Sequence, residues 1–189
     1  MRAFIAIDVP NAIKDKAYKV AKEVAEAAKA REVDKEAMHI TLHFLGEISE
    51  SQKGKIESAI DSIEAQRFVI EIKGLGFFGG KVPRVAIAKI FEGRDELKSL
   101  YNMLYGPIEK AGVALEKREF SPHLTLARIK TEKLGRREIE EIWEALKKLE
   151  SAYKDFEFGS FLCERIVLKK SEFTGKGVIH TVLHEKILD

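Results

Sequence analysis

The sequence of 189 residues predicts an α+β fold, in which two duplicated β-α-β-α-β halves form one bilobed domain with pseudo-twofold symmetry. Two observations predict this fold. The expected strands and helices follow one another in the same order twice, and a motif, His-x-Thr-Leu, occurs at residues 39–42 and again at 123–126. No low-complexity linker separates the halves, so we expect a single domain over 1–189 with lobes of about 1–80 and 81–189. The symmetry would bring the two motif strands together across a central cleft lined by antiparallel sheets.

The first half contains three strand patterns and two helix patterns. Apolar, β-prone runs predict the strands, and apolar residues at helical spacing predict the helices. In order, these are strand 4–7, helix 11–30, motif strand 38–45, a helix opened by Ser49 with Ile56, Ile60 and Ile63 on its buried face, and strand 68–73. The glycine-rich stretch 74–80 is expected to form a turn between the halves.

The second half repeats this order and then adds two strands. The expected elements are strand 85–88, a helix over about 97–111, motif strand 120–129, a helix over about 139–149, strand 156–162, and two final strands near 166–169 and 178–186. An internal duplication explains both the repeated order and the repeated motif.

Each motif places an imidazole and a hydroxyl on one face of its strand. Side chains alternate between the two faces of a strand, so His39 and Thr41 lie opposite to Ile40 and Leu42. The same alternation holds for His123 and Thr125. The aliphatic residues can be buried, which leaves two histidines and two threonines to face a shared site.

Two histidines in one site are suited to paired acid–base catalysis. The unperturbed pKa of histidine, about 6.5, lets one ring accept a proton while the other donates one. For a phosphodiester, one histidine would activate the nucleophile, the other would protonate the leaving oxygen, and Thr41 and Thr125 would bind the non-bridging oxygens. This scheme requires no metal and no cofactor.

Metal binding is the competing interpretation of the histidines. His39 and His43 are four residues apart, as are His180 and His184, and that interval chelates zinc on a helix. On a strand, residues four apart are separated by roughly 13 Å and cannot share an ion. We therefore expect His43, His180 and His184 to be rim or surface residues, although alternation allows one or two of them to face the cleft.

The composition excludes several classes of protein. The net charge of +2 produces no global field that demands nucleic acid, and no apolar run approaches the roughly 18 residues of a membrane span. The N-terminus lacks the features of a signal peptide. A single cysteine, Cys163, excludes an internal disulfide and favours the cytoplasm. Asparagine and glutamine are scarce while Lys and Glu are abundant, which is typical of thermophiles.

Three arginines and one glycine-rich segment are further candidates. Arg84, Arg118 and Arg128 are the basic residues nearest the motif strands and could pair with phosphate. Arg128 lies an odd number of residues from Thr125, so it reaches the His/Thr face only through a bulge or twist. The segment 74–79 is spelled like a dinucleotide-binding fingerprint, but another strand follows it instead of a helix. Its alternative role is a loop that offers Phe77 or Phe78 for base stacking.

The paired motifs resemble those of the two-histidine phosphoesterase superfamily. The similarity to its LigT/ThpR branch, the RNA 2',3'-cyclic phosphodiesterases also described as 2'-5' RNA ligases, covers essentially the whole chain. The segments that carry it are Phe4-Ile5-Ala6-Ile7-Asp8, His39-Ile40-Thr41-Leu42-His43-Phe44-Leu45-Gly46, Gly74-Leu75-Gly76-Phe77-Phe78, Pro83-Arg84-Val85 and Ser121-Pro122-His123-Leu124-Thr125-Leu126-Ala127-Arg128.

The resemblance implies hydrolysis of a terminal 2',3'-cyclic phosphate on RNA to a 2'-phosphomonoester. It implies that His39 donates a proton to the departing 3' oxygen, that His123 activates water, and that Thr41 and Thr125 bind the phosphate. With a 5'-hydroxyl in place of water, the reverse reaction would form a 2'-5' linkage. His43 departs from the pattern and could add a cationic contact for RNA.

Two alternatives remain beside this activity. The same site could act on small cyclic nucleotides such as ADP-ribose cyclic phosphate, or the protein could bind RNA or nucleotides without catalysis. RNA ends or nucleotides are the expected partners, with no membrane association and with a monomer as the default state.

Overall fold

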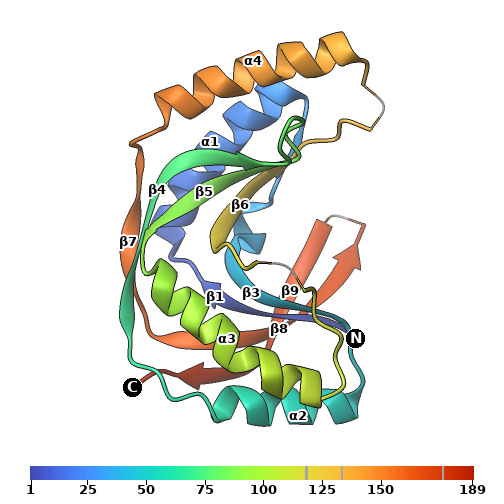
Figure 1. Ribbon diagram of the computed structural model, residues 1–189, viewed down its shortest axis with the longest axis vertical. Helices are drawn as coiled ribbons and strands as arrows, with labels where there is room; N and C mark the ends of the chain where they lie inside the picture. Colours follow the sequence, from blue (N-terminus) through green and yellow to red (C-terminus); the bar gives the residue numbers. More distant parts are fainter. Residues whose placement is uncertain (118, 133, 176) are drawn as a thin grey trace.

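In the computed structural model, four long helices cover one continuous, curled antiparallel sheet (Figure 1). The structure describes residues 1–117, 119–132, 134–175 and 177–189. The elements are β1 (Arg2–Asp8), α1 (Asn11–Ala28), β2 (Arg31–Glu32), η1 (Lys35–Ala37), β3 (His39–Glu47), α2 (Glu50–Asp61), β4 (Phe68–Phe78), β5 (Val85–Glu92), α3 (Arg94–Lys110), β6 (His123–Arg128), α4 (Arg136–Ala152), β7 (Glu157–Cys163), β8 (Arg165–Thr174) and β9 (Gly177–Ile187). Every strand and helix expected from the sequence is present.

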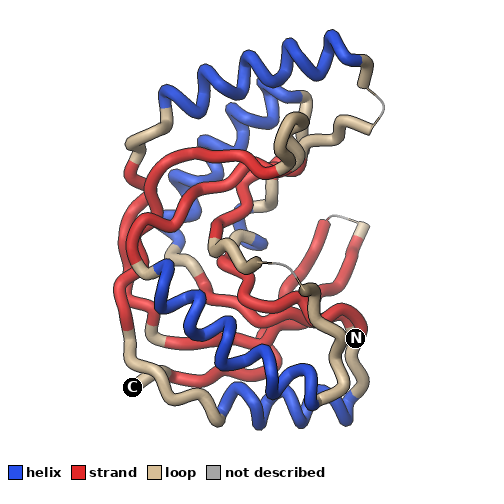
Figure 2. Tube along the Cα trace, viewed as in Figure 1, coloured by secondary structure: helices blue, strands red, loops and turns tan. Residues whose placement is uncertain are grey.

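The strand order shows the predicted duplication. The sheet runs β7-β4-β5-β6-β3-β1-β8-β9, with the short β2 also paired to β6, so four strands lie on each side of the junction between the motif strands β6 and β3. The helices lie in two pairs, α1 with α4 and α2 with α3, at opposite ends of the molecule (Figures 1 and 2). Each pair packs against one half of the sheet.

The two halves of the sheet exchange elements, which differs from the expected lobes of about 1–80 and 81–189. Helix α1 packs against β5, β6 and β7, whereas α3 packs against β3. Strand β4 lies between β7 and β5, and β8 and β9 extend the sheet beyond β1. A division near residue 80 therefore does not describe the structure. The physical reason is that each helix after a first strand buries its apolar face on the opposite half of the sheet.

The glycine-rich stretch continues a strand instead of forming the expected turn. Strand β4 extends through Phe78, with an irregular register between Ile72 and Leu75. Gly74 lies in this irregularity at a φ of 83°, and a Cβ there would approach the Lys154 carbonyl oxygen to 2.6 Å. Glycine is thus required where β4 passes close to the segment before β7, and the turn comes only at residues 79–82.

A single core fills the space between the sheet and the helices. Its members include the aliphatic faces of α1 and α3 and the motif residues Ile40, Leu42, Leu124 and Leu126, all of them buried. Helix α2 begins at the expected residue, because the Ser49 hydroxyl accepts from the Gln52 amide at 3.2 Å and the Gln52 side chain accepts from Ser49. The predicted helical spacings therefore correspond to real buried faces.

The sharp junction between β5 and α3 depends on Gly93, and its substitution tests the fold. Gly93 has a φ of 84°, and a methyl group there would lie 2.6 Å from the Val69 carbonyl oxygen. The left-handed conformation alone costs an L-residue about 1–2 kcal/mol, so we expect Gly93→Ala to lower the free energy of unfolding by about 2 kcal/mol or more in denaturant titrations.

Gly54→Ala is the matched control for this prediction. Gly54 lies inside α2, and a Cβ there meets nothing within 4 Å. Because alanine is the better helix former, we expect this variant to gain about 0.5–1 kcal/mol. Equal stabilities of the two variants would contradict the description of the Gly93 junction.

Candidate active site

The two motif strands meet at one residue pair at the centre of the sheet. Ile40 of β3 lies opposite Leu124 of β6 in an antiparallel pair, and both side chains are fully buried. This register aligns His39 with Thr125 and Thr41 with His123 on the other face of the sheet. All four of these side chains are partly exposed. The structure thus brings the four predicted residues to one face, which we call the site face.

Each motif strand contains an extra residue directly after its threonine. In the β1–β3 ladder, Ala6 pairs with Thr41 and Ile5 with His43, so Leu42 is extra. In the β5–β6 ladder, Ile87 pairs with Thr125 and Ala86 with Ala127, so Leu126 is extra. A bulge of this kind reverses the alternation of the residues that follow it. The two bulges occupy equivalent positions in the two motifs.

The reversal decides which later residues reach the site face. Phe44 and Arg128 come to the site face and are exposed, whereas His43 and Ala127 turn into the core. The sequence allowed Arg128 to reach this face only through a bulge, and the structure contains that bulge. Arg128 lies directly opposite Arg31 of β2 in the ladder, so two arginines are cross-strand neighbours at this edge.

His43 does not join the other predicted residues. Its ring is 3% exposed, stacks on Tyr101 of α3 at 4.1 Å, and has its Nε2 atom 2.8 Å from the Tyr101 carbonyl oxygen. Burial lowers the pKa of His43 below its usual value. The expected cationic contact with RNA therefore has no support in the structure, because the bulge at Leu42 carries this ring to the helix side of the sheet.

His39 lies in a cluster of rings on the site face. Phe4 of β1 stacks on it with ring centroids 4.5 Å apart, and His180 of β9 meets it edge-on at 5.2 Å. Phe4 also belongs to a small buried cluster with Ala6 and Val167, which is separate from the main core. These ring contacts restrict the position of the His39 ring and shield part of it from water.

The surroundings of His39 disfavour its protonated form. The pKa of His39 is lowered to about 3, chiefly by burial and then by the charges of His180 and Lys169, while a hydrogen bond to the Ala37 backbone and the Asp8 carboxylate act in the opposite direction. Asp8 lies across the ladder from His39 and is bonded to Lys169. In the unliganded protein, His39 is therefore neutral at physiological pH.

His123 is held by its own backbone. Its Nδ1 atom donates to the Ser121 carbonyl oxygen at 2.7 Å, because a carbonyl can only accept. In the neutral ring the proton therefore resides on Nδ1, and Nε2 carries the lone pair that a general base requires. Phe78 meets the ring edge-on at 4.9 Å. The possible role of Phe78 in base stacking, suggested by the sequence, agrees with this position.

Some residues of the site face were not evident from the sequence. His180, Lys169 and Asp8 surround His39, and Arg31 lies beside Arg128. The pairings of β1 with β3, of β8 with β1, of β9 with β8 and of β2 with β6 bring them there, and no local pattern indicates such contacts. Of the other two candidate arginines, Arg84 directly precedes β5, and its backbone carbonyl accepts a hydrogen bond from the Ile129 amide at 2.8 Å. Arg118 lies outside the described residues.

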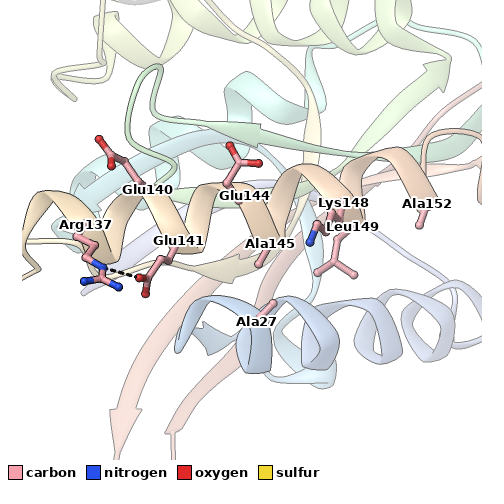
Figure 3. Close-up of a pocket in the computed structure, with 9 residues that line it drawn as sticks. All are labelled: Ala27, Arg137, Glu140, Glu141, Glu144, Ala145, Lys148, Leu149 and Ala152. Carbon is pink, nitrogen blue, oxygen red and sulfur yellow. Dashed lines mark hydrogen bonds and ion pairs between the residues drawn. The ribbon is translucent and has the colours of Figure 1, made fainter.

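Other features of the described residues do not form a second catalytic centre. No group of three or more His, Cys, Asp or Glu side chains there could hold a metal ion, and no described helix is long and apolar enough to cross a membrane. Cys163 is buried, which raises the pKa of its thiol to about 12 and leaves it unreactive. One surface cavity lies between α1 and α4, lined by residues such as Ala27, Ala145 and Leu149, away from the motif strands (Figure 3).

Comparison with known proteins places the chain among phosphoesterases. A family model described as LigT like Phosphoesterase matches residues 7–87 and 91–180. An RNA 2',3'-cyclic phosphodiesterase of Archaeoglobus fulgidus is 33% identical over 181 residues, covering 95% of this chain and 96% of its own. One of Aeropyrum pernix is 39% identical over 154 residues, covering 81% and 83%.

Solved structures share the fold across the entire chain. E. coli LigT complexed with 3'-AMP superposes with a TM-score of 0.80 at 24% identity, covering 99% of this chain and 97% of its own. A protein of Thermus thermophilus superposes with a TM-score of 0.76 at 25% identity, covering 100% and 98%. By sequence and by fold, the chain belongs to the LigT-like phosphoesterase family.

Proposed function

We propose that the protein hydrolyses the terminal 2',3'-cyclic phosphate of RNA to a 2'-phosphomonoester. The observation that carries this proposal is the pairing of Ile40 with Leu124, which aligns two histidines and two threonines on one face. Relatives named RNA 2',3'-cyclic phosphodiesterase match 95% and 81% of the chain and support the same substrate. Simple binding of phosphate would not need two proton-transferring groups.

In the proposed reaction, His123 is the general base and His39 the general acid. The His123 Nε2 atom takes a proton from water, whose oxygen attacks phosphorus. The bond from phosphorus to the 3' oxygen breaks, and that oxygen receives a proton from His39. The product carries a 2'-phosphate and a free 3'-hydroxyl. Thr41 and Thr125 donate hydrogen bonds to the non-bridging oxygens, whose negative charge they stabilise.

The neighbours of the two histidines support this order of roles. Asp8 is the cross-strand partner of His39 and favours its protonated form, whereas the equivalent partner of His123 is Lys89. The cross-strand ladder thus pairs the proposed acid with a carboxylate and the proposed base with an ammonium group. At the edge beyond Thr125, Arg128 and Arg31 are direct cross-strand partners, and like charges at such positions are unfavourable unless an anion joins them. We propose that a phosphate of the RNA occupies this position.

An end-labelled oligonucleotide with a 2',3'-cyclic phosphate tests the activity. In the presence of EDTA we expect conversion to the 2'-phosphate, since the proposed site transfers protons through side chains alone. Loss of all activity with EDTA, or a 3'-phosphate product, would contradict the mechanism. ADP-ribose cyclic phosphate should be assayed in parallel, and a preference for it over RNA would assign a small nucleotide as the substrate.

Substitution of either histidine tests the paired mechanism. We expect His39→Ala and His123→Ala each to lower kcat by at least about 10²-fold, the usual contribution of a general acid or base. His184→Gln is the matched control, because His184 faces α2 and contacts Asp61 at 2.7 Å. If either site variant keeps a rate near that of the control, the paired mechanism is wrong.

The protonation of His39 should depend on the bound anion. The positive charge of its ring is unfavourable in the empty site, where its pKa is about 3, but a phosphate beside it supplies the opposite charge. We therefore expect the pKa of His39, measured by NMR of the imidazole nitrogens, to rise when inorganic phosphate or a 2'-nucleotide binds. An unchanged titration in the loaded protein would exclude His39 as the proton donor.

A further inference from the structure

A third histidine, His180, contacts the ring that we propose as the acid. It lies in β9, far along the chain from β3, yet its ring centroid is 5.2 Å from that of His39 with the planes at 85°. It also meets Phe4 edge-on at 4.8 Å. The His39 ring therefore stacks on the face of Phe4 and also meets the ring of His180 edge-on. These two contacts restrict its rotation.

The β8–β9 hairpin holds His180 in this position. Ser171 is its direct partner in the ladder, and the Ser171 hydroxyl lies 3.2 Å from the His180 Nδ1 atom. Lys169, two residues before Ser171 in β8, pairs with Phe4 of β1. The hairpin is thus attached to the same strand that carries Phe4, and its register places one polar pair beside His39.

Charged groups from three elements face His180. Asp8 extends from β1, Lys169 from β8 and Lys14 from α1, with His39 of β3 as the remaining titratable neighbour. Burial and the charge of Lys169 lower the pKa of His180, and Asp8 partly opposes them. Two lysines and one aspartate therefore give this side of the site face an excess of positive charge, which suits a phosphate ligand.

We propose that His180 is a positioning residue for His39: its ring contact orients the His39 imidazole for proton transfer, and protonation of either ring opposes protonation of the other. The proposal rests on the function proposed above. His180 acts through the His39 ring and transfers no proton in the reaction. Its two effects are separable, because a ring without charge can supply the contact alone.

Two substitutions separate the contact from the charge. His180→Ala removes both, and we expect kcat to fall about tenfold with KM within about twofold, because misorientation of the acid slows the chemical step more than binding. His180→Phe keeps an aromatic edge beside His39 and Phe4, and we expect it to restore kcat to within about threefold of the wild-type rate. Failure of phenylalanine to restore kcat would overturn the contact as the cause.

The titration of His39 measures the charge effect without any substrate. In His180→Phe we expect the NMR-measured pKa of His39 to rise by about 0.5–2, as follows from removing a like charge about 5 Å away. The control is His184→Gln on the same strand, which should leave this titration unchanged. An unaltered His39 titration in His180→Phe would overturn the charge effect.

These measurements also separate the proposal from the function on which it rests. The titration requires neither RNA nor turnover, so it can succeed even if the cyclic phosphate is not the substrate. A wild-type protein that hydrolyses the cyclic phosphate, together with a His180→Ala variant of equal kcat and equal His39 titration, would overturn the role of His180 alone. Thermal melts of each variant confirm that the fold is intact.

Discussion

The site face depends on one backbone constraint, the antiparallel pairing of Ile40 with Leu124. Both side chains are fully buried, and burial of an aliphatic side chain of this size is worth about 1.5–3 kcal/mol. Because strand residues alternate, fixing these two inward fixes their neighbours outward. A shift of either motif strand by one residue would turn its histidine into the core and break the alignment with the other motif. The same apolar contacts that stabilise the centre of the sheet therefore set the geometry of the proposed catalytic groups.

The matching bulges at Leu42 and Leu126 extend this constraint along both strands. Each bulge keeps its leucine in the core and reverses the alternation beyond it, so that Arg128 reaches the site face while His43 turns toward α3. The duplicated scaffold thus repeats a backbone feature as well as a motif. The side chains on this symmetric frame have diverged, and His39 and His123 now have unlike neighbours: a cluster of rings and a carboxylate around one, and Phe78 and Lys89 beside the other.

The sequence predicted the features that arise from local patterns. Apolar spacing identified the long strands and helices but neither β2 nor η1, and alternation placed His39, Thr41, His123 and Thr125 on one face. It could not predict the exchange of α1 and α3 between the halves of the sheet, since any apolar helix face can pack on either half. Nor could it assign His180, whose contact with His39 depends on the register of β8 with both β1 and β9. For Arg128, the sequence showed that a bulge or twist is needed to bring the side chain to the site face, but it did not show that the bulge exists.

The electrostatics of the site connect catalysis to the charge of the substrate. His39 is a poor proton carrier in the empty protein, because burial, His180 and Lys169 all oppose its positive charge. Under the proposed mechanism, a cyclic phosphate brings a negative charge to the same face and favours the protonated ring, so the substrate itself would generate the acid for its own cleavage. A neutral ligand of the same shape would leave His39 unprotonated. In this mechanism, discrimination in favour of anionic phosphodiesters would follow from the protonation of one histidine, in addition to any contact with the threonines or arginines.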